Sequence, residues 1–158
     1  MTPLNNPLEV GMRSLALLSE SFPAPLDLAQ LVYLDHAVLH SGDLNGPPSL
    51  HPRLPAGPGE LAMRRILIDQ GLIVLMRAGL AEVRATEDGL VYRATEGGPG
   101  FIEILESPYM GALRERAQWV IREHGLPARD SRVATRSITS RWVDEFRNSL
   151  PLNGNDHA

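Results

Sequence analysis

Apolar residues at helical spacing in the first forty positions predict two successive helices. The first is expected to begin after Asn6 and Pro7, residues typical of a helix N-cap and first turn, and to end before Pro23. Its apolar positions are Leu8, Met12, Leu15, Leu18 and Phe22. The second helix, from about Asp27 to His40, is apolar over most of its surface, which predicts that it is well buried.

The next segment, residues 43–59, holds five prolines and three glycines and shows little periodicity. It is expected to be a long ordered loop rather than a regular element. A third helix is expected from Glu60 to about Gly79, with Gly71 as its weakest position. Its apolar stripe consists of Leu61, Ile68, Leu72 and Leu75.

Residues 80–95 change to the period of a β-strand, and Asp88-Gly89 predicts a two-residue hairpin turn. With Asp88 and Gly89 in the turn, Val83 lies opposite Ala94 and Ala85 opposite Tyr92 on the inner side, while Arg84 lies opposite Arg93 on the outer side. Two facing arginines would suit a phosphate or a partner's carboxylate. Alternatively, the neighbouring Glu82 neutralises them and solvent screens the remainder.

Beyond the hairpin, a short helix is expected from Phe101 to Leu105, and another from about Tyr109 to His124. A last helix from about Ser131 to Leu150 aligns Ile138, Trp142, Phe146 and Leu150. The tail at 151–158 is expected to fray.

Three helices followed by a hairpin is the element order of a winged helix-turn-helix domain, in a chain that is mostly α-helical. We therefore predict a winged-helix domain at 6–106, with a long loop at 42–59 and a wing at 81–95. A C-terminal helical extension at 107–150 and a flexible tail follow it. Such a domain uses the same surfaces for DNA or for protein, so the fold by itself does not decide the function.

Composition narrows the chemistry of this 158-residue chain, which contains no cysteine and no lysine. Thiolate metal sites, disulfides, cysteine nucleophiles and lysine-bearing phosphate loops are therefore excluded. The start shows no basic-then-apolar leader, and no stretch approaches the roughly 20 apolar residues of a membrane span. We expect a soluble cytoplasmic protein without a cofactor.

Histidines near the end of the second helix raise the question of a metal site. His36 and His40 stand one turn apart, as in zinc-binding His-Glu-x-x-His helices, but Ala37 replaces the catalytic glutamate. His51 or Asp43 could complete a ligand set, although the spacing matches no metal motif. The alternative is a histidine that interacts with the helix dipole and loop histidines that bind backbone groups. We expect no metal and no enzyme.

Charge argues weakly for nucleic acid, because the net charge is −4 and only residues 113–147 are basic, with eight arginines against five acids. Arg64 and Arg65 would lie where a winged helix meets a DNA groove. A local pair of Arg64 with Glu60 is the alternative. The roughly 17-residue loop before this helix, in place of a turn of about 3–4 residues, would crowd a groove.

Several segments in order resemble the middle component of ABC three-component systems, bacterial antiviral systems of the Lamassu type. They are NPLEVGMRSLALL, LDLAQLVYLDHAVLHSGD, GPPSLHP, GELAMRRILIDQGL and YRATE, within about residues 6–124, and HSGD with GPPSLHP is the most specific combination. The resemblance implies a winged-helix accessory subunit encoded beside an SMC- or Rad50-like ABC ATPase that senses DNA and a separate effector, often a nuclease. It supplies no catalytic residues.

The resulting hypothesis is a non-enzymatic adaptor that joins the ATPase to the effector and meets DNA only through the complex. Its partner-binding loop would present Asp43, Asn45, Pro47, Pro48 and His51, which a rigid loop docks at little entropic cost. Contacts to nucleic acid or to an acidic partner would come from Arg64, Arg65, Arg84 and Arg93. Trp142 and Phe146 are either core residues or interface anchors. The alternatives are an autonomous winged-helix transcription regulator and, third, a metal-dependent enzyme.

Overall fold

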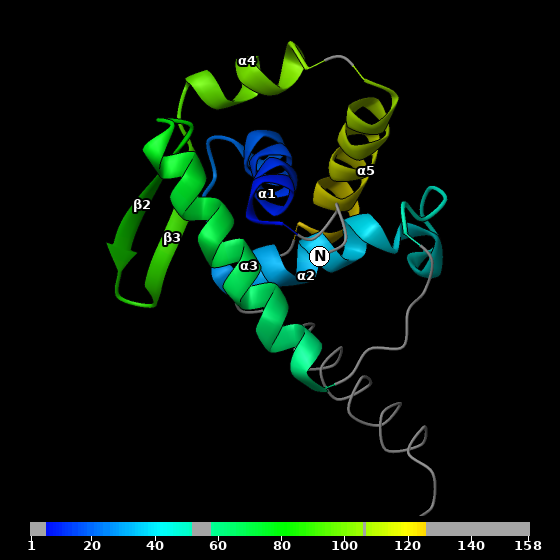
Figure 1. The fold of residues 1–158 in the computed structure, drawn as a ribbon, viewed down its shortest axis with the longest axis horizontal. Helices are drawn as coiled ribbons and strands as arrows, with labels where there is room; N and C mark the ends of the chain where they lie inside the picture. The colour runs from blue at the N-terminus through cyan, green and yellow to red at the C-terminus, as the bar shows by residue number, and fades with distance from the viewer. Residues whose placement is uncertain (1–5, 52–57, 106, 126–158) are drawn as a thin grey trace, which may run out of the picture.

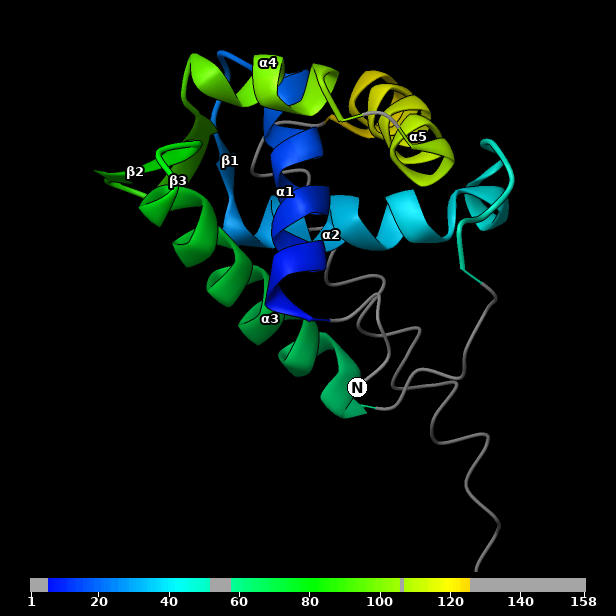
Figure 2. The ribbon, with the colours of Figure 1, turned by 45° about the horizontal axis from the view of Figure 1, so that its top comes forward.

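Helix α1 (Pro7–Ser21) runs through the middle of the molecule, and the other helices and the sheet pack around it (Figures 1 and 2). The computed structural model describes residues 6–51, 58–105 and 107–125, with the backbone alone at 58–61. Within α1, every residue from Arg13 to Leu18 is buried. Asn6 caps this helix by accepting a 2.9 Å hydrogen bond from the amide of Glu9, so the predicted N-terminus is confirmed.

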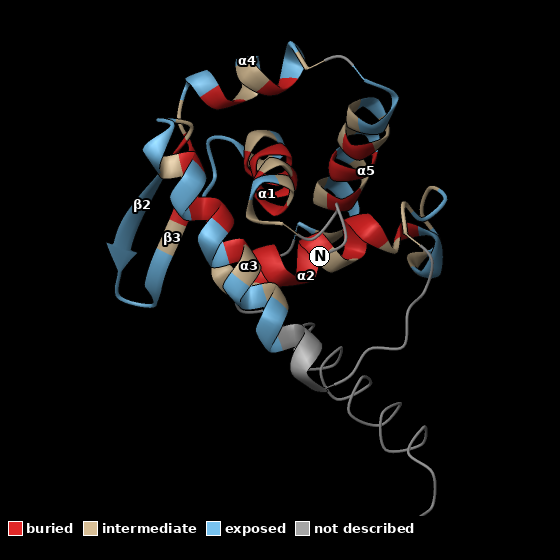
Figure 3. Cartoon of the chain, in the orientation of Figure 1, coloured by how far each residue is buried: buried red, intermediate tan, exposed pale blue. Residues whose placement is uncertain are grey.

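Helix α2 (Leu28–Leu39) crosses α1 and is buried along most of its length, as predicted (Figures 2 and 3). Asp27 and Gln30 form a capping box at its start, with hydrogen bonds of 2.7 and 2.8 Å. A single 3₁₀ turn, η2 (Ser41–Leu44), follows immediately. The expectation of a loop without regular structure at 42–59 was therefore wrong for residues 42–44, which form part of this 3₁₀ turn.

Helix α3 (Pro58–Arg77) packs on α1 through an unusually close backbone contact at two glycines. A β-carbon added at Gly71 would lie 2.8 Å from the nitrogen of Gly11, and one added at Gly11 would lie 3.2 Å from the carbonyl oxygen of Gly71. Gly71 therefore has a packing role. Glycine lowers the helix propensity of α3, but it lets α1 and α3 approach closely, and a side chain at this position would push the two helices apart.

The sheet is antiparallel and contains β1 (Leu26–Asp27), β2 (Ala81–Thr86) and β3 (Gly89–Ala94) in the order β1-β3-β2. Strand β1 was not predicted, because a two-residue strand has no periodicity to detect. It pairs with β3, with Leu26 opposite Tyr92, and so ties the entry of α2 to the hairpin.

The predicted hairpin is present, but its predicted register was wrong. Glu87 and Asp88 form the turn, Thr86 pairs with Gly89, and Arg84 faces Val91 instead of Arg93. Gly89 takes a φ of 119°, a conformation that suits glycine at the first position of the returning strand. The inner side of β3 is nevertheless as predicted, since Tyr92 and Ala94 are buried.

Two further helices close the structure around the C-terminal side of α1. Helix α4 (Gly97–Glu103) begins four residues before the predicted start at Phe101. Helix α5 (Pro108–His124) has the predicted extent and is capped by Ser107, which accepts a 3.0 Å hydrogen bond from the amide of Met110. Their buried residues, among them Ile102, Leu113 and Val120, join the core formed by α1, α2 and α3.

Residues 126–158 lie outside the described part of the chain, and with them the predicted last helix, Trp142 and Phe146. Among the described helices, none is both long enough and apolar enough to cross a membrane.

Candidate functional site

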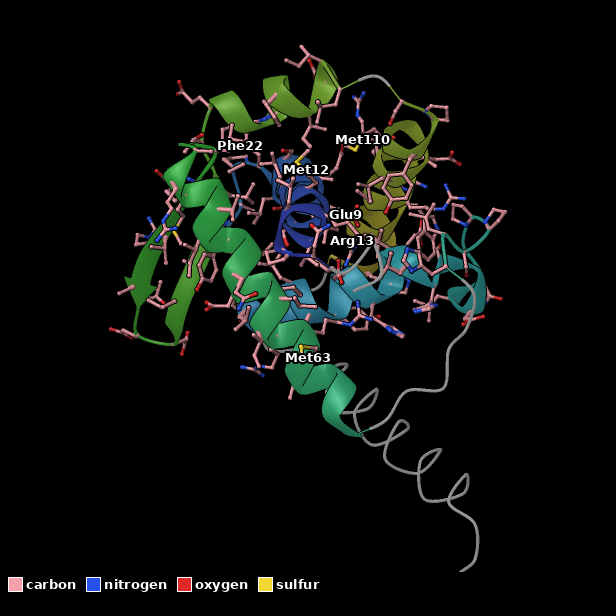
Figure 4. The ribbon with its side chains drawn as sticks, viewed as in Figure 1. Glu9, Met12, Arg13, Phe22, Met63 and Met110 are labelled. Atoms are coloured by element: carbon pink, nitrogen blue, oxygen red, sulfur yellow. The ribbon has the colours of Figure 1, made fainter. Side chains whose placement is uncertain are left out.

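A buried ionic network joins the three helices at the centre of the molecule. The carboxylate of Asp35 on α2 has no exposed surface, and it lies 2.7 Å from Nε of Arg13 on α1 and 2.5 Å from Nη1 of Arg64 on α3. A second contact of 3.4 Å runs from Nη2 of Arg13 to the other carboxylate oxygen. Figure 4 shows Arg13 where α1 passes α2.

Electrostatics hold this network in its charged form. Burial alone would raise the pKa of Asp35, but the guanidinium groups of Arg13 and Arg64 lower that pKa below its ordinary value. The side chain of Arg13 also interacts with Tyr109 of α5, so the network as a whole links four helices. The network orients α1, α2 and α3 relative to one another, because a buried charge must stay beside its counter-charges.

The network gives Arg64 a different role from the one predicted from the sequence, which was a contact with nucleic acid or an acidic partner. Its side chain is 12% exposed and its charge is directed to Asp35. Asp35 and Arg13 were not among the residues predicted from the sequence. A signal was present: each is the charged residue in the middle of an apolar helical segment, and such charges are rarely buried unless paired.

The loop after α2 folds back on the end of that helix through its own hydrogen bonds. Ser41 donates through Oγ to the carbonyl of Pro47 over 2.8 Å, and the amide of Gly42 donates to Oγ of Ser49 over 2.9 Å. The amide of His51 donates to the carbonyl of Leu39 over 3.2 Å. These bonds close residues 41–51 into a compact turn-rich unit, which we call the α2 loop.

Helix α5 holds the α2 loop in place. Arg116 is buried and donates from Nε to the carbonyl of Pro48 over 2.8 Å, and from Nη1 to the carbonyl of Ala112 over 2.9 Å. The ring of Trp119 lies so close to Gly46 that a β-carbon there would overlap it. The α2 loop is therefore fixed to the domain by side chains from a helix about 70 residues further along the chain.

The residues predicted to bind a partner lie at the outer surface of this fixed loop. Asp43, Asn45 and Pro48 are exposed, whereas Pro47 and His51 are partly covered. Asn45 adopts the left-handed conformation, with φ of 62°. The structure thus brings these five side chains together on one ordered segment, and their binding to a partner stays a prediction.

The histidines pack together beside this loop. The rings of His36 and His40 are 4.8 Å apart, centre to centre. Burial, followed by the nearby Arg64, lowers the pKa of His40; burial and the charge of Arg13 lower the pKa of His51. Among the described residues, no three histidine, aspartate or glutamate side chains are grouped so that they could hold a metal ion.

The outer face of the β2–β3 hairpin carries less free positive charge than the sequence suggested. Glu82 pairs with Arg93 directly across the strands, over 2.9 Å from Nε, so the predicted facing of Arg84 and Arg93 is replaced by an ion pair. Arg84 and Arg65 are exposed. A hollow of about 270 Å³ separates this face from Pro23 and Pro25. The structure therefore does not bring the four predicted arginines together as one basic patch.

Comparison with known families shows which family the chain belongs to. The sequence model of the family described as ABC-three component (ABC-3C) system Middle Component 2 matches residues 3–145, and the chain belongs to this family. Comparisons with curated proteins and with solved structures gave no match. The resemblance seen in the sequence is thereby confirmed at the level of the ABC three-component system, while the Lamassu type stays a prediction. Membership implies that the protein works with other components of the system.

Proposed function

We propose that this protein is a non-enzymatic adaptor subunit of an antiphage defence complex of the Lamassu type. It joins an SMC- or Rad50-like ABC ATPase, which senses DNA, to an effector nuclease in the cytoplasm. Family membership supports a role within a multi-component system. The element order α1-β1-α2-α3-β2-β3, with the hairpin in the position of a wing, supports a winged-helix domain as its framework.

One observation carries the adaptor role: the α2 loop is exposed and yet fixed. Arg116 and Trp119 hold its backbone from α5, while Asp43, Asn45 and Pro48 face outward. A segment that is ordered before it binds loses little conformational entropy on docking. An exposed loop fixed in this way has the properties of a protein-recognition surface and lacks the converging catalytic groups of an active site.

An autonomous DNA-binding regulator is the alternative, and the arrangement of the arginines gives it less support. Arg64 is occupied by Asp35 and Arg93 by Glu82, which leaves Arg65 and Arg84 exposed. Each phosphate contact adds to affinity mainly through charge, so the two exposed arginines among the four predicted contacts provide a small positive surface on a chain of net charge −4.

Co-expression of the chain with the other two components of its system, followed by size-exclusion chromatography, tests the proposal. We expect a stable complex that the single change Asp43→Arg weakens by about tenfold or more, as a reversed charge at a docked position does. Glu87→Arg, the same reversal at the exposed wing turn, is the matched control and leaves the complex intact. Elution of the wild-type chain alone, with a salt-sensitive shift of specific DNA by the isolated protein, would instead establish the regulator.

A further inference from the structure

A line of exposed apolar side chains follows the outward side of α3. Met63 and Ile66 are 54% and 51% exposed, and Ile73 and Val74 are each 37% exposed. The opposite side of the same helix carries the core residues Ile68, Leu72 and Leu75. Figure 3 shows the outward side of α3 as exposed, and Figure 4 shows Met63 on it. A helix that is apolar on both sides is normally covered on both sides.

The spacing of these residues matches the contact line of a helix pair. Met63, Ile66, Gln70, Ile73 and Arg77 follow one another at alternating intervals of three and four residues, and we call them the α3 seam. Alternating intervals of three and four are those of the a and d positions of a heptad, which insert between the side chains of a facing helix. From Met63 to Arg77 the seam is about 21 Å long at 1.5 Å per residue.

DNA does not suit the α3 seam. In a winged-helix domain this side of the third helix would enter the major groove, where base edges are recognised through donors and acceptors. Three of the five seam residues, Met63, Ile66 and Ile73, are apolar and offer none. Arg64, which could have supplied a positive charge at the start of the helix, is bound to Asp35.

A second copy of the chain does not suit the seam either, because of its charges. A parallel pairing would place Arg77 of each copy at facing core positions of the seam. An antiparallel pairing centred on Gln70 would bring Asp69 of each copy, which flanks the seam, to the same side near the two-fold axis. Either arrangement sets like charges against each other in a poorly solvated contact.

We propose that the α3 seam binds an amphipathic helix from another component of the same three-component system. That helix presents apolar residues at intervals of three and four, an acidic residue toward Arg77 and a basic residue toward Asp69. The proposal rests on the proposed function for the existence of a stable complex. It adds a surface on α3 to the α2 loop, which comes from a different segment of the chain.

The absence of cysteine from the chain permits a direct test of this surface. Ile73→Cys and Ile66→Cys each introduce a single thiol, whose rate of reaction with a fluorescent maleimide is measured in the isolated chain and in the co-expressed complex. We expect each rate to fall by about tenfold or more in the complex, since a covered thiol reacts only after local opening. Ile104→Cys is the matched control, because Ile104 is a 71% exposed isoleucine on another part of the molecule.

Charge substitutions provide the second measurement. Ile66→Asp and Ile73→Asp alter exposed positions, so the circular dichroism spectrum of the isolated chain is expected to be unchanged. Affinity for the complex is expected to fall by about tenfold or more, because an unpaired carboxylate would be buried against the partner helix. Ile104→Asp is expected to leave affinity unchanged.

Other outcomes overturn the proposal in separable ways. Unchanged labelling of both thiols in an intact complex removes the seam and leaves the adaptor function standing. Slow labelling of both thiols in the isolated chain also overturns the proposal, because the seam is then already covered. A dimer mass by light scattering would assign the seam to a second copy. A monomer mass would assign it to another segment of this chain. If the wild-type chain forms no complex, the proposed function fails, and the inference fails with it.

Discussion

Nη1 of Arg64 lies 2.5 Å from a carboxylate oxygen of Asp35, and this contact turns one of the charges in the first half of α3 toward the core. Arg13 completes the network from α1. The pairing has two consequences. It fixes the angle at which α3 leaves the core, and it leaves the outward side of α3 with an apolar line where a groove-reading helix would carry basic and polar groups.

Removing the carboxylate is expected to destabilise the protein strongly. Asp35→Asn leaves two arginines in a buried site without a counter-charge, and loss of one partner of such a network costs about 3–5 kcal/mol of unfolding free energy. Urea denaturation followed by circular dichroism measures it. The triple variant Arg13→Met, Asp35→Leu, Arg64→Met removes all charges and is expected to recover most of the loss. If Asp35→Asn lowers the free energy of unfolding by less than about 1 kcal/mol, the network contributes little to stability.

The same network predicts how stability changes in acid. The pKa of Asp35 is lower in the folded chain than its ordinary value of 3.8, so its contribution is complete above that value and is lost as the pH falls through the folded pKa. We expect the stability difference between wild type and Asp35→Asn to narrow as the pH drops below 3.8. A difference that is constant down to pH 2 contradicts the assignment.

His40 and His51 are expected to make the stability of the fold depend on pH in a second range, closer to neutrality. The pKa values of His40 and His51 lie below the ordinary 6.5 in the folded chain, so the unfolded chain takes up protons first as the pH falls. Stability is therefore expected to decline as the pH drops below 6.5, through the range above the folded pKa values. The double variant His40→Gln, His51→Gln should flatten this part of the curve, as measured by urea denaturation at pH 7.5 to 5.

The glycine contact between α1 and α3 predicts opposite results for two similar substitutions. Gly71→Ala improves helix propensity by about 1 kcal/mol, but its β-carbon would lie 2.8 Å from the nitrogen of Gly11. We expect a net loss of about 1–3 kcal/mol, because the two backbones must separate. Gly111→Ala on α5, with no atom within 4 Å of the added carbon, should instead gain up to about 1 kcal/mol. Thermal and urea denaturation distinguish the two.

The fixed position of the α2 loop depends on Arg116. Arg116→Met removes the hydrogen bond from Nε to the carbonyl of Pro48 and leaves that carbonyl with only its longer 3.4 Å bond from Oγ of Ser41. A hydrogen bond to a charged group contributes about 1.5–3 kcal/mol. Hydrogen exchange is expected to accelerate at the amides of Gly42, Gly46 and His51. Arg114→Met, two positions away, removes an arginine whose Nε has no hydrogen-bond partner, and should leave those amides unchanged. Equal exchange in both variants would show that α5 does not hold the loop.

Much of the local structure follows from the sequence. The cap at Asn6, the buried second helix, the helix at 109–124 and the hairpin all arise from short-range preferences and from the period of apolar residues. The hairpin register did not follow, because the sequence fits a two-residue turn at Glu87-Asp88 as well as at Asp88-Gly89. The pairing of Glu82 with Arg93 and the positive φ of Gly89 accompany the first of these placements.

The sequence by itself determined the main helices and the hairpin and, through its motifs, the family. Only the tertiary structure decided which polar groups of those elements pair with one another. Asp35 and Arg13 are 22 residues apart and Asp35 and Arg64 are 29 apart, while Arg116 meets Pro48 across 68 residues. No local preference encodes such pairings. They form because buried charges and carbonyls must find partners once the helices have packed, and that packing leaves the α2 loop and the α3 seam facing outward.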